Sequence, residues 1–252
     1  MAVDHIAEHR QAQADRFDKE SARYEETHSS AAAQAYRDKF YRRRLFDIDL
    51  KDRDVLDAMC ASGIDTSFLI SKGGRVSGLD ISPECAKIYR DRYDRPCSVA
   101  SIDQTGLPDA SLDVVYISGG LHHVIPMLES TLKEIHRVLR PSVVFCFVEP
   151  NSDTWANKLR EIWYKRDSRF TDEERGISYS RELLPRMKSI GFAEDDKFAG
   201  GNIAYLLVQQ ANVLGTSGLV KTLSPLLFAA ERFFGWMPFS PKLYFCARWR
   251  KV

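Results

Sequence analysis

The chain has 252 residues, of which 44% are hydrophobic and 28% charged, proportions that are ordinary for a globular protein. Its 36 lysines and arginines face 35 aspartates and glutamates, so the formal net charge is +1. This balance lacks the basic excess that non-specific nucleic-acid binding needs, and the hydrophobic content argues against intrinsic disorder. A chain of this length can bury one large core, so we expect a single domain with additional segments.

The cysteines are scattered along the chain, and no two are spaced as metal ligands usually are. We therefore expect reduced thiols, no metal site and a cytoplasmic location. The first residues are polar, so we expect no secretory signal. The stretch nearest to a membrane span, residues 198–220, is interrupted by glycines and polar amides and is a poor candidate.

Residues 1–47 predict a charge-rich helical segment that precedes the main domain. Four apolar residues fall on one face of the predicted helix, and the arginines at 42–44 then lie on its solvated side. The apolar face consists of Tyr36, Phe40, Tyr41 and Leu45. The basic triplet would suit nucleic acid or lipid headgroups, but its acidic neighbours favour an ordinary solvated helix end.

From residue 54 onward, short apolar stretches alternate with segments of helical periodicity. The predicted strands are residues 55–56, 75–79, 96–100, 113–117 and 143–148. Ser82 and Pro83 predict a helix start, and a helical stripe over residues 128–139 is closed by Pro141. This alternation predicts an α/β fold with a doubly wound, mostly parallel Rossmann-like sheet.

The C-terminal part predicts a helix over residues 180–190, then a strand at 192–198 and a final antiparallel strand at 243–249. Residues 200–241 separate these two strands and are too many for an unstructured loop. We therefore expect a helical insertion at 200–241. The main domain is then formed by residues 48–199 and 242–252.

Two acidic residues stand at the ends of successive predicted strands. Asp57 ends the first strand and is followed by a turn of small residues up to Gly63, and Asp80 ends the second. Ligands of open α/β sheets bind beyond the carboxyl ends of the strands, and a carboxylate there can accept hydrogen bonds from both ribose hydroxyls of an adenosine. Either residue alone is more often a helix cap or a surface residue. The two together, around a small-residue turn, favour a nucleoside cofactor.

These segments resemble the class I S-adenosylmethionine-dependent methyltransferases of the small-molecule kind, closely over residues 54–150 and loosely towards the C-terminus. The family's first motif, an acidic residue followed by alternating glycines, is similar to Asp57–Gly63, and its second acidic position is similar to Asp80. The segments that match in order and spacing are residues 57–63, 78–82, 101–115, 119–123 and 132–141.

The resemblance implies S-adenosylmethionine as the cofactor and assigns its contacts. Asp57 and the turn after it would contact the methionine moiety, mostly through backbone groups and water. Asp80 would contact the ribose and Ile81 the adenine. Residues 101–103 would line the adenine edge, and Gly119 would lie under the sulfonium. The implied cofactor-binding residues are Asp57, Ala58, Met59, Cys60, Ala61, Gly63, Asp80, Ile81, Ser101, Ile102, Asp103, Ser118 and Gly119.

Met59 and Ala61 depart from the family pattern, because they stand where glycines are usual. Glycine permits a positive φ and a close approach to the ligand. Ala61 adds one methyl group, whereas Met59 is a larger change, and we expect its side chain to belong to the core rather than the pocket. A nicotinamide-dependent dehydrogenase, the main competing interpretation, would need three glycines for a pyrophosphate, and only Gly63 remains.

Methyl transfer needs the acceptor nucleophile aligned with the methyl group and one proton managed. His122 and His123 follow the fourth strand, where acceptor and cofactor would meet, and are the candidate general bases. The alternative is that one or both only hydrogen-bond the loop backbone. Trp155 is spaced with Leu159 and Trp163 as a core-facing helix stripe. The candidate acceptor-binding residues are Glu149, Arg160, Tyr164, Asn202 and Tyr205.

The sequence thus predicts methyl transfer to O, N or C of a small-molecule or lipid-like acceptor, in secondary metabolism or in glycan or lipid modification. The alternative is a methyltransferase-like protein that binds the cofactor or a partner without turnover. We expect residues 200–241 to form a helical lid over the site, with Asn202 and Tyr205 facing the acceptor; a dimer interface through 233–239 is the rival. The expected acceptor has an apolar part, no nucleic acid is expected, and membrane-surface contact and a monomer or homodimer stay open.

Overall fold

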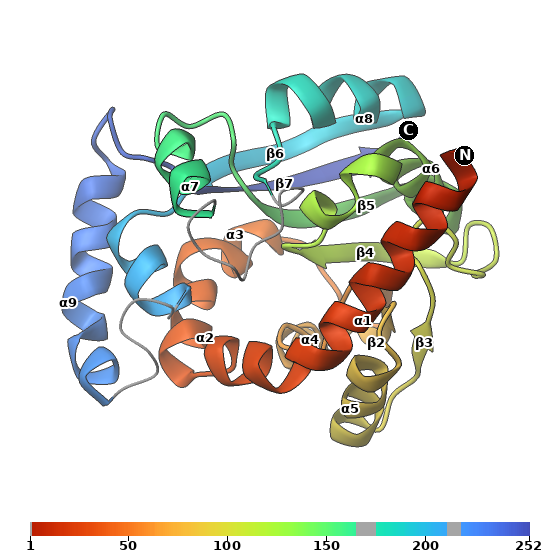
Figure 1. Cartoon of the computed structure of the whole chain (residues 1–252), viewed down its shortest axis with the longest axis horizontal. Coiled ribbons are helices and arrows are strands. Elements are labelled where there is room, and N and C mark those ends of the chain that lie inside the picture. Colours follow the sequence, from red (N-terminus) through yellow and green to blue (C-terminus); the bar gives the residue numbers. More distant parts are fainter. Residues whose placement is uncertain (1, 165–174, 211–217) are drawn as a thin grey trace.

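One mixed sheet organises the molecule (Figure 1). The structure is a computed structural model that describes residues 2–164, 175–210 and 218–252. Within them, seven strands lie in the order β3-β2-β1-β4-β5-β7-β6. The strands are β1 (Asp54–Ala58), β2 (Arg75–Asp80), β3 (Cys97–Val99), β4 (Leu112–Ser118), β5 (Leu139–Pro150), β6 (Phe192–Gly200) and β7 (Tyr244–Lys251).

The predicted strands are all present, and the predicted antiparallel strand is confirmed as β7, which pairs antiparallel with both β5 and β6. β1 pairs in parallel with β2 on one side and β4 on the other. The chain therefore builds outward from β1 to β3 and then returns to the other side of β1. This reversal creates a crevice at the carboxyl ends of β1 and β4, where ligands of such sheets bind.

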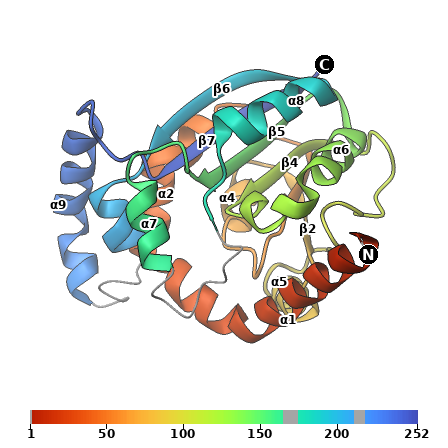
Figure 2. The same cartoon turned by 45° about the horizontal axis from the view of Figure 1, so that its top comes forward.

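Helices cover both faces of the sheet (Figures 1 and 2). The α-helices are α1 (Ala2–His28), α2 (Ala31–Arg37), α3 (Arg43–Leu45), α4 (Thr66–Ser71), α5 (Pro83–Tyr93), α6 (Leu128–Val138), α7 (Asn157–Tyr164), α8 (Leu184–Ile190) and α9 (Gly218–Gly235). Short 3₁₀ or π-helical segments are η1 (Asp38–Arg42), η2 (Leu121–His123), η3 (Ile125–Met127), η4 (Tyr179–Leu183) and η5 (Tyr205–Gln209). The predicted start of α5 is confirmed, because the Ser82 hydroxyl accepts the Cys85 N–H at 3.0 Å and Pro83 follows it.

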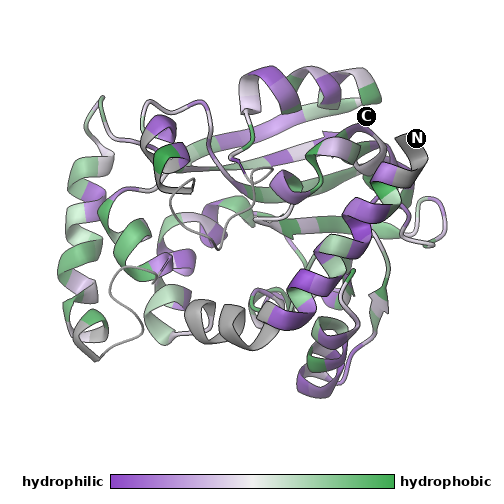
Figure 3. Ribbon diagram, viewed as in Figure 1, coloured by the Kyte–Doolittle hydropathy of each residue, from purple (hydrophilic) through white to green (hydrophobic). Residues whose placement is uncertain are grey.

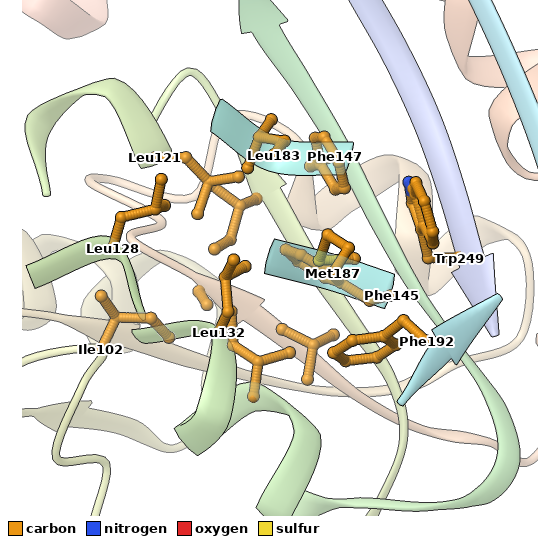
Figure 4. Packing of buried hydrophobic residues seen from close by; sticks show 14 of the residues in the cluster. Ile102, Leu121, Leu128, Leu132, Phe145, Phe147, Leu183, Met187, Phe192 and Trp249 are labelled. Carbon is orange, nitrogen blue, oxygen red and sulfur yellow. The ribbon is translucent and has the colours of Figure 1, made fainter. Parts of the chain in front are cut away.

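Two hydrophobic cores hold these layers together. On one face, Leu132 of α6 and Met187 of α8 pack with Phe145 and Trp249 from β5 and β7 (Figure 4). On the other, the predicted stripe of the N-terminal segment packs against the sheet, with Tyr36, Tyr41 and Leu45 buried and Phe40 partly buried. Burial on both faces explains why the strands read as nearly continuous apolar runs.

Arg42 corrects the prediction that all three arginines at 42–44 are solvated. Its side chain is 2% exposed, and its Nε donates to Asp65 Oδ1 at 2.9 Å. Arg43 and Arg44 are exposed as predicted, and Arg44 pairs with Asp196 at the surface. The buried arginine ties the N-terminal segment to the loop that precedes α4.

The described part of the insertion between β6 and β7 contains η5 and α9, and residues 236–241 after α9 form turns and irregular backbone. η5 and α9 both pack against α2, and Glu231 of α9 is buried and accepts the Tyr36 hydroxyl at 3.0 Å. Across the described ranges, no helix is both long and apolar enough to cross a membrane.

Candidate functional site

A cavity with about 670 Å³ of empty space opens at the carboxyl ends of β1, β2 and β4, the crevice that the topology predicts. The sheet-side lining comes from loops after four strands and consists of Met59, Ala61, Leu79, Asp80, Ile81, Ala100, Ser101, Ile102, Ser118, Gly119, Gly120, His123, Val124 and Met127. The opposite wall is α1, which crosses the strand ends and contributes His9, Arg10, Gln13 and Phe17 (Figure 2).

Eight of the thirteen predicted cofactor residues line this cavity. They are Met59, Ala61, Asp80, Ile81, Ser101, Ile102, Ser118 and Gly119. The other predicted residues, Asp57, Ala58, Cys60, Gly63 and Asp103, do not line it and act one layer further back. The strand-end turn and the loops after β2, β3 and β4 are thus brought together as the resemblance implies.

The turn after β1 keeps a glycine-like backbone without the glycines. Met59 and Ala61 adopt φ values of 54° and 47°, and Gly63 adopts 81°. A non-glycine residue in this left-handed region costs about 1–2 kcal/mol, so the fold maintains this turn against its intrinsic preference. Met59 also corrects the expectation that it belongs only to the core. Its side chain packs on the core and lines the cavity, with its sulfur pressed against the site of Gly120.

Asp80 is positioned by backbone N–H groups on both sides. Its two carboxylate oxygens accept from Ala61 N at 2.8 Å and Ser82 N at 2.9 Å, while burial raises the pKa of the carboxyl. Each carboxylate oxygen has a further lone pair, so the residue can still accept hydroxyl hydrogen bonds from a ligand. The backbone contacts lock the turn after β1 onto the end of β2.

Asp57 lies beneath the turn rather than in the cavity. Its carboxyl is 3% exposed, and Oδ2 accepts the Thr66 hydroxyl at 2.6 Å. Burial, reinforced by the nearby Asp65 carboxylate, raises its pKa to about 8, so the group is largely protonated at neutral pH. The Asp57 side chain thus supports the turn from below, and contact of this segment with a methionine moiety, mostly through backbone groups and water, stays a prediction.

α1 contributes residues to the site that the sequence did not predict. Arg10 forms an ion pair with Asp103, which also accepts the Ser101 hydroxyl, and the His9 Nε2–H donates to the His123 carbonyl at 2.8 Å. Gln13 lies between these ties, and its buried Oε1 accepts no hydrogen bond from the described residues. The available signal was the spacing of His9, Gln13 and Phe17 at successive helical turns, but two of these residues are polar and did not mark a buried face.

The loop after β4 is held by one buried carboxylate. Glu149 Oε1 accepts the N–H groups of Gly120 at 2.9 Å and Leu121 at 2.8 Å, and Oε2 lies 2.9 Å from His122 Nδ1. An ionised carboxylate only accepts, so the neutral imidazole carries its proton on Nδ1 and leaves Nε2 with a free lone pair. Glu149 is 1% exposed and does not line the cavity, so its predicted acceptor contact is corrected to a positioning role.

The two predicted histidines occupy different places. His123 lines the cavity, stacks edge-on against Phe17 at 5.3 Å between ring centroids, and has its pKa held well below the usual range by burial and by His122. The His122 ring lies 4.0 Å from that of His123 and beside Gly119, and its side chain is 16% exposed. His122 does not itself line the cavity and lies next to two residues that do, Gly119 and His123.

The remaining acceptor-binding candidates do not converge on this cavity. Asn202 is buried and donates to the Glu231 carbonyl at 3.0 Å, and Tyr205 packs on Tyr244 at 5.1 Å, so both belong to the second core and not to an acceptor site. The side chains of Arg160 and Tyr164 lie outside the described residues.

The predicted lid is also corrected. The wall opposite the sheet is α1, and no described residue of 200–241 lines the cavity, because η5 and α9 pack on α2 instead. The five cysteines are buried and free. No group of three or more His, Cys, Asp or Glu side chains in the described ranges could hold a metal ion.

Comparisons with known proteins agree with this geometry. A family profile described as a methyltransferase domain matches residues 56–147, which include the end of β1, all of β2, β3 and β4, and the Gly119–His123 loop. An uncharacterized methyltransferase of Synechocystis is 33% identical over 98 residues, 38% of this chain and 46% of that protein. The malonyl-[acyl-carrier protein] O-methyltransferase of Serratia marcescens is 31% identical over 109 residues, 43% of this chain and 41% of that protein.

Each of these matches spans less than half of the relative's own length. Among solved structures, a SAM-dependent methyltransferase from Archaeoglobus fulgidus has the same fold, with a TM-score of 0.63 at 16% identity, over 90% of this chain and 98% of that one. The seven-stranded order, the acidic residues at the ends of β1 and β2, and the family match converge. Residues 56–147 match a methyltransferase-domain family, and the fold around them is that of S-adenosylmethionine-dependent methyltransferases.

Proposed function

We propose that this protein transfers the methyl group of S-adenosylmethionine to a small acceptor that has an apolar part, and that His122 removes the acceptor's proton. The observation that carries this proposal is the cavity itself, which joins the predicted cofactor residues to an apolar region beside the histidine pair.

The described residues fit the cofactor. Asp80 would accept the ribose hydroxyls, and Ile81 and Ile102 offer apolar surface to the adenine. Gly119 has a φ of 68°, and a Cβ there would meet only the His122 ring, at 4.0 Å, so the backbone after β4 can approach the ligand closely. The unpaired amide oxygen of Gln13 offers a hydrogen bond from the α1 side.

When bound, the cofactor supplies a methyl group activated by its positively charged sulfur. The protein then has to align the acceptor with this methyl group and exclude water. Phe17, Val124 and Met127 form an apolar wall next to His123 and favour an acceptor with a hydrophobic body. The buried His123 stays neutral at physiological pH and contributes its ring to this wall.

Proton removal falls to His122. The Glu149 carboxylate fixes its ring and its tautomer, which leaves Nε2 free to accept a proton from a hydroxyl or amine. Glu149 would also stabilise the imidazolium that forms. This arrangement supports O- or N-methylation over transfer to an unactivated carbon.

A second candidate function, cofactor binding without turnover, rests on one observation. Met59 replaces a usual glycine and occupies part of the cavity wall. If its side chain blocks alignment of an acceptor, the cavity would bind the cofactor and not catalyse transfer. The two candidates differ in their product, not in their affinity for the cofactor.

The test is transfer of labelled methyl groups from S-adenosylmethionine to fractionated small-molecule extracts, compared between wild type, His122→Ala and the exposed control His5→Ala. The proposal expects a labelled product from wild type and His5→Ala. In His122→Ala we expect turnover to fall by about 100-fold or more, with unchanged cofactor affinity by calorimetry. Cofactor binding without any labelled product would favour the second candidate, and wild-type turnover in His122→Ala would remove the histidine from the chemistry.

A further inference from the structure

A group of large apolar side chains stands exposed on and beside α9. Trp236 is 90% exposed, Phe239 70%, Leu226 68%, Phe233 62% and Trp155 61%. These five residues are called the α9 face here. Trp155 is tied to the segment after α9, since its Nε1 donates to the Phe239 carbonyl at 3.1 Å, and Phe233, Trp236 and Phe239 lie within the continuous residues 233–239. Trp155 thereby corrects the prediction that it lies in the core.

The α9 face is the outer side of a helix that is firmly anchored on its inner side. Phe228 and Glu231 are buried against the N-terminal segment, and Glu231 accepts the backbone N–H groups of Asn202 and Ala204. Leu226 and Phe233 are two helical turns apart and share the opposite side. Figure 3 shows hydrophobic colouring along α9, which lies at an edge of the molecule, far from β3. The helix thus has two apolar faces, one packed against the protein and the other exposed.

The exposed charge of α9 and of the segment that follows it, residues 218–242, has one sign. Residues 200–252 contain one acidic residue, Glu231, and this carboxylate is buried. The basic residues of 218–242 are Lys221, Arg232 and Lys242, whereas Arg248 and Arg250 on β7 pair with Asp195 away from α9. Arg232 is exposed within α9, and the Lys242 ammonium donates to the Gly235 carbonyl at 2.5 Å, next to Trp236. An anionic surface complements this set.

From these observations we infer that the α9 face docks on the surface of an anionic lipid bilayer. Tryptophan and phenylalanine flanked by basic residues are the composition of helices that lie in the membrane interface, where apolar side chains enter the headgroup region and cations meet anionic lipids. The helix would lie on the bilayer rather than cross it. Indole N–H groups suit this boundary because one side of the ring is apolar and the other polar.

The same charges disfavour a second copy of the chain as the occupant. A two-fold interface packs a patch against its own copy, so Arg232 and Lys242 would be brought towards their counterparts. No exposed acid of residues 218–252 is there to neutralise them, within the part that the structure describes. A lipid surface offers the opposite charge at no such cost.

The experiment is sedimentation of the full chain with phosphatidylcholine vesicles that contain or lack phosphatidylglycerol. Wild type is expected to bind the anionic vesicles and to bind the neutral vesicles less. The double variant Trp236→Ser/Phe239→Ser is expected to lower partitioning at least about tenfold, since two large apolar side chains no longer enter the interface. Arg232→Glu is expected to reduce binding to the anionic vesicles alone. Val99→Ser, an exposed apolar residue on the distant strand β3, is the matched control and should bind as wild type.

None of the changed side chains is buried, so each variant is expected to fold, and thermal unfolding checks this. Absence of vesicle binding by wild type, or equal binding by the double variant, would overturn the inference. So would a wild-type dimer in light scattering that the double variant converts to a monomer without any lipid effect, since the α9 face would then belong to a second copy. None of these outcomes depends on methyl transfer.

Discussion

The Nδ1 atom of His122 lies 2.9 Å from the Glu149 carboxylate, which also accepts backbone N–H groups of the loop that carries the histidine. One buried side chain at the end of β5 therefore fixes both the backbone and the imidazole beside the cavity. A residue held so completely cannot bind an acceptor itself. Its carboxylate instead orients the His122 imidazole so that Nε2 can accept a proton.

Replacing Glu149 with Gln tests this positioning role. The amide keeps the size of the side chain but loses the charge that favours the imidazolium, so turnover should fall about tenfold or more while cofactor affinity changes little. The measurement is kcat alongside the calorimetric Kd for S-adenosylmethionine. Glu129→Gln, on the exposed face of α6, is the matched control and should behave as wild type. Unchanged kcat in Glu149→Gln would show that the carboxylate only holds the loop.

Gln13 should report on closure of α1 over the ligand. Its amide oxygen is buried without a hydrogen-bond donor in the described residues, a state that costs about 1–3 kcal/mol and that a bound ligand could relieve. Gln13→Leu should therefore raise the unfolding temperature of the free protein and reduce the further rise that S-adenosylmethionine produces. Gln11→Leu, on the exposed side of the same helix, is the control. An equal ligand-induced rise in Gln13→Leu and wild type would exclude this contact.

The buried Asp57 predicts a pH dependence of stability. Burial raises its folded-state pKa from 3.8 to about 8, so folding favours the protonated form. Its contribution to stability is full below about pH 4 and is lost as the pH rises through about 8. Asp57→Asn, which cannot ionise, should lose less stability than wild type between about pH 5 and 8, by on the order of a few kcal/mol. Chemical denaturation across this range checks the difference. The exposed Asp91→Asn should follow wild type, and parallel pH profiles for Asp57→Asn and wild type would contradict the assignment.

The strands and the cofactor side of the cavity were predictable because their signals are local. An acidic residue at a strand end and a turn of small residues identify the sheet edge without knowledge of the packing. Asp80, predicted in this way, lines the cavity. Asp57 reads identically in the sequence, yet its side chain turns towards Thr66 beneath the turn, and only the folded backbone decides between these directions.

The features that could not be predicted depend on contacts between distant segments. Arg42 sits among charged residues and reads as solvated until Asp65 is brought beside it by the fold. The lid was assigned to the most apolar segment, but apolar content cannot say which surface it covers, and α9 packs on α2 while its other side stays exposed. The true wall, α1, presents polar residues to the cavity, so its sequence resembles a solvated helix.

Calorimetric titration of wild type and Asp80→Ala would show whether this cavity binds S-adenosylmethionine through Asp80. Wild type should bind S-adenosylmethionine and its demethylated product, and should not bind a nicotinamide dinucleotide. Asp80→Ala should bind about tenfold to a hundredfold more weakly, because the ribose hydroxyls lose a charged acceptor. Equal affinity in the two proteins, no heat of binding in wild type, or preference for the nicotinamide cofactor would contradict the account.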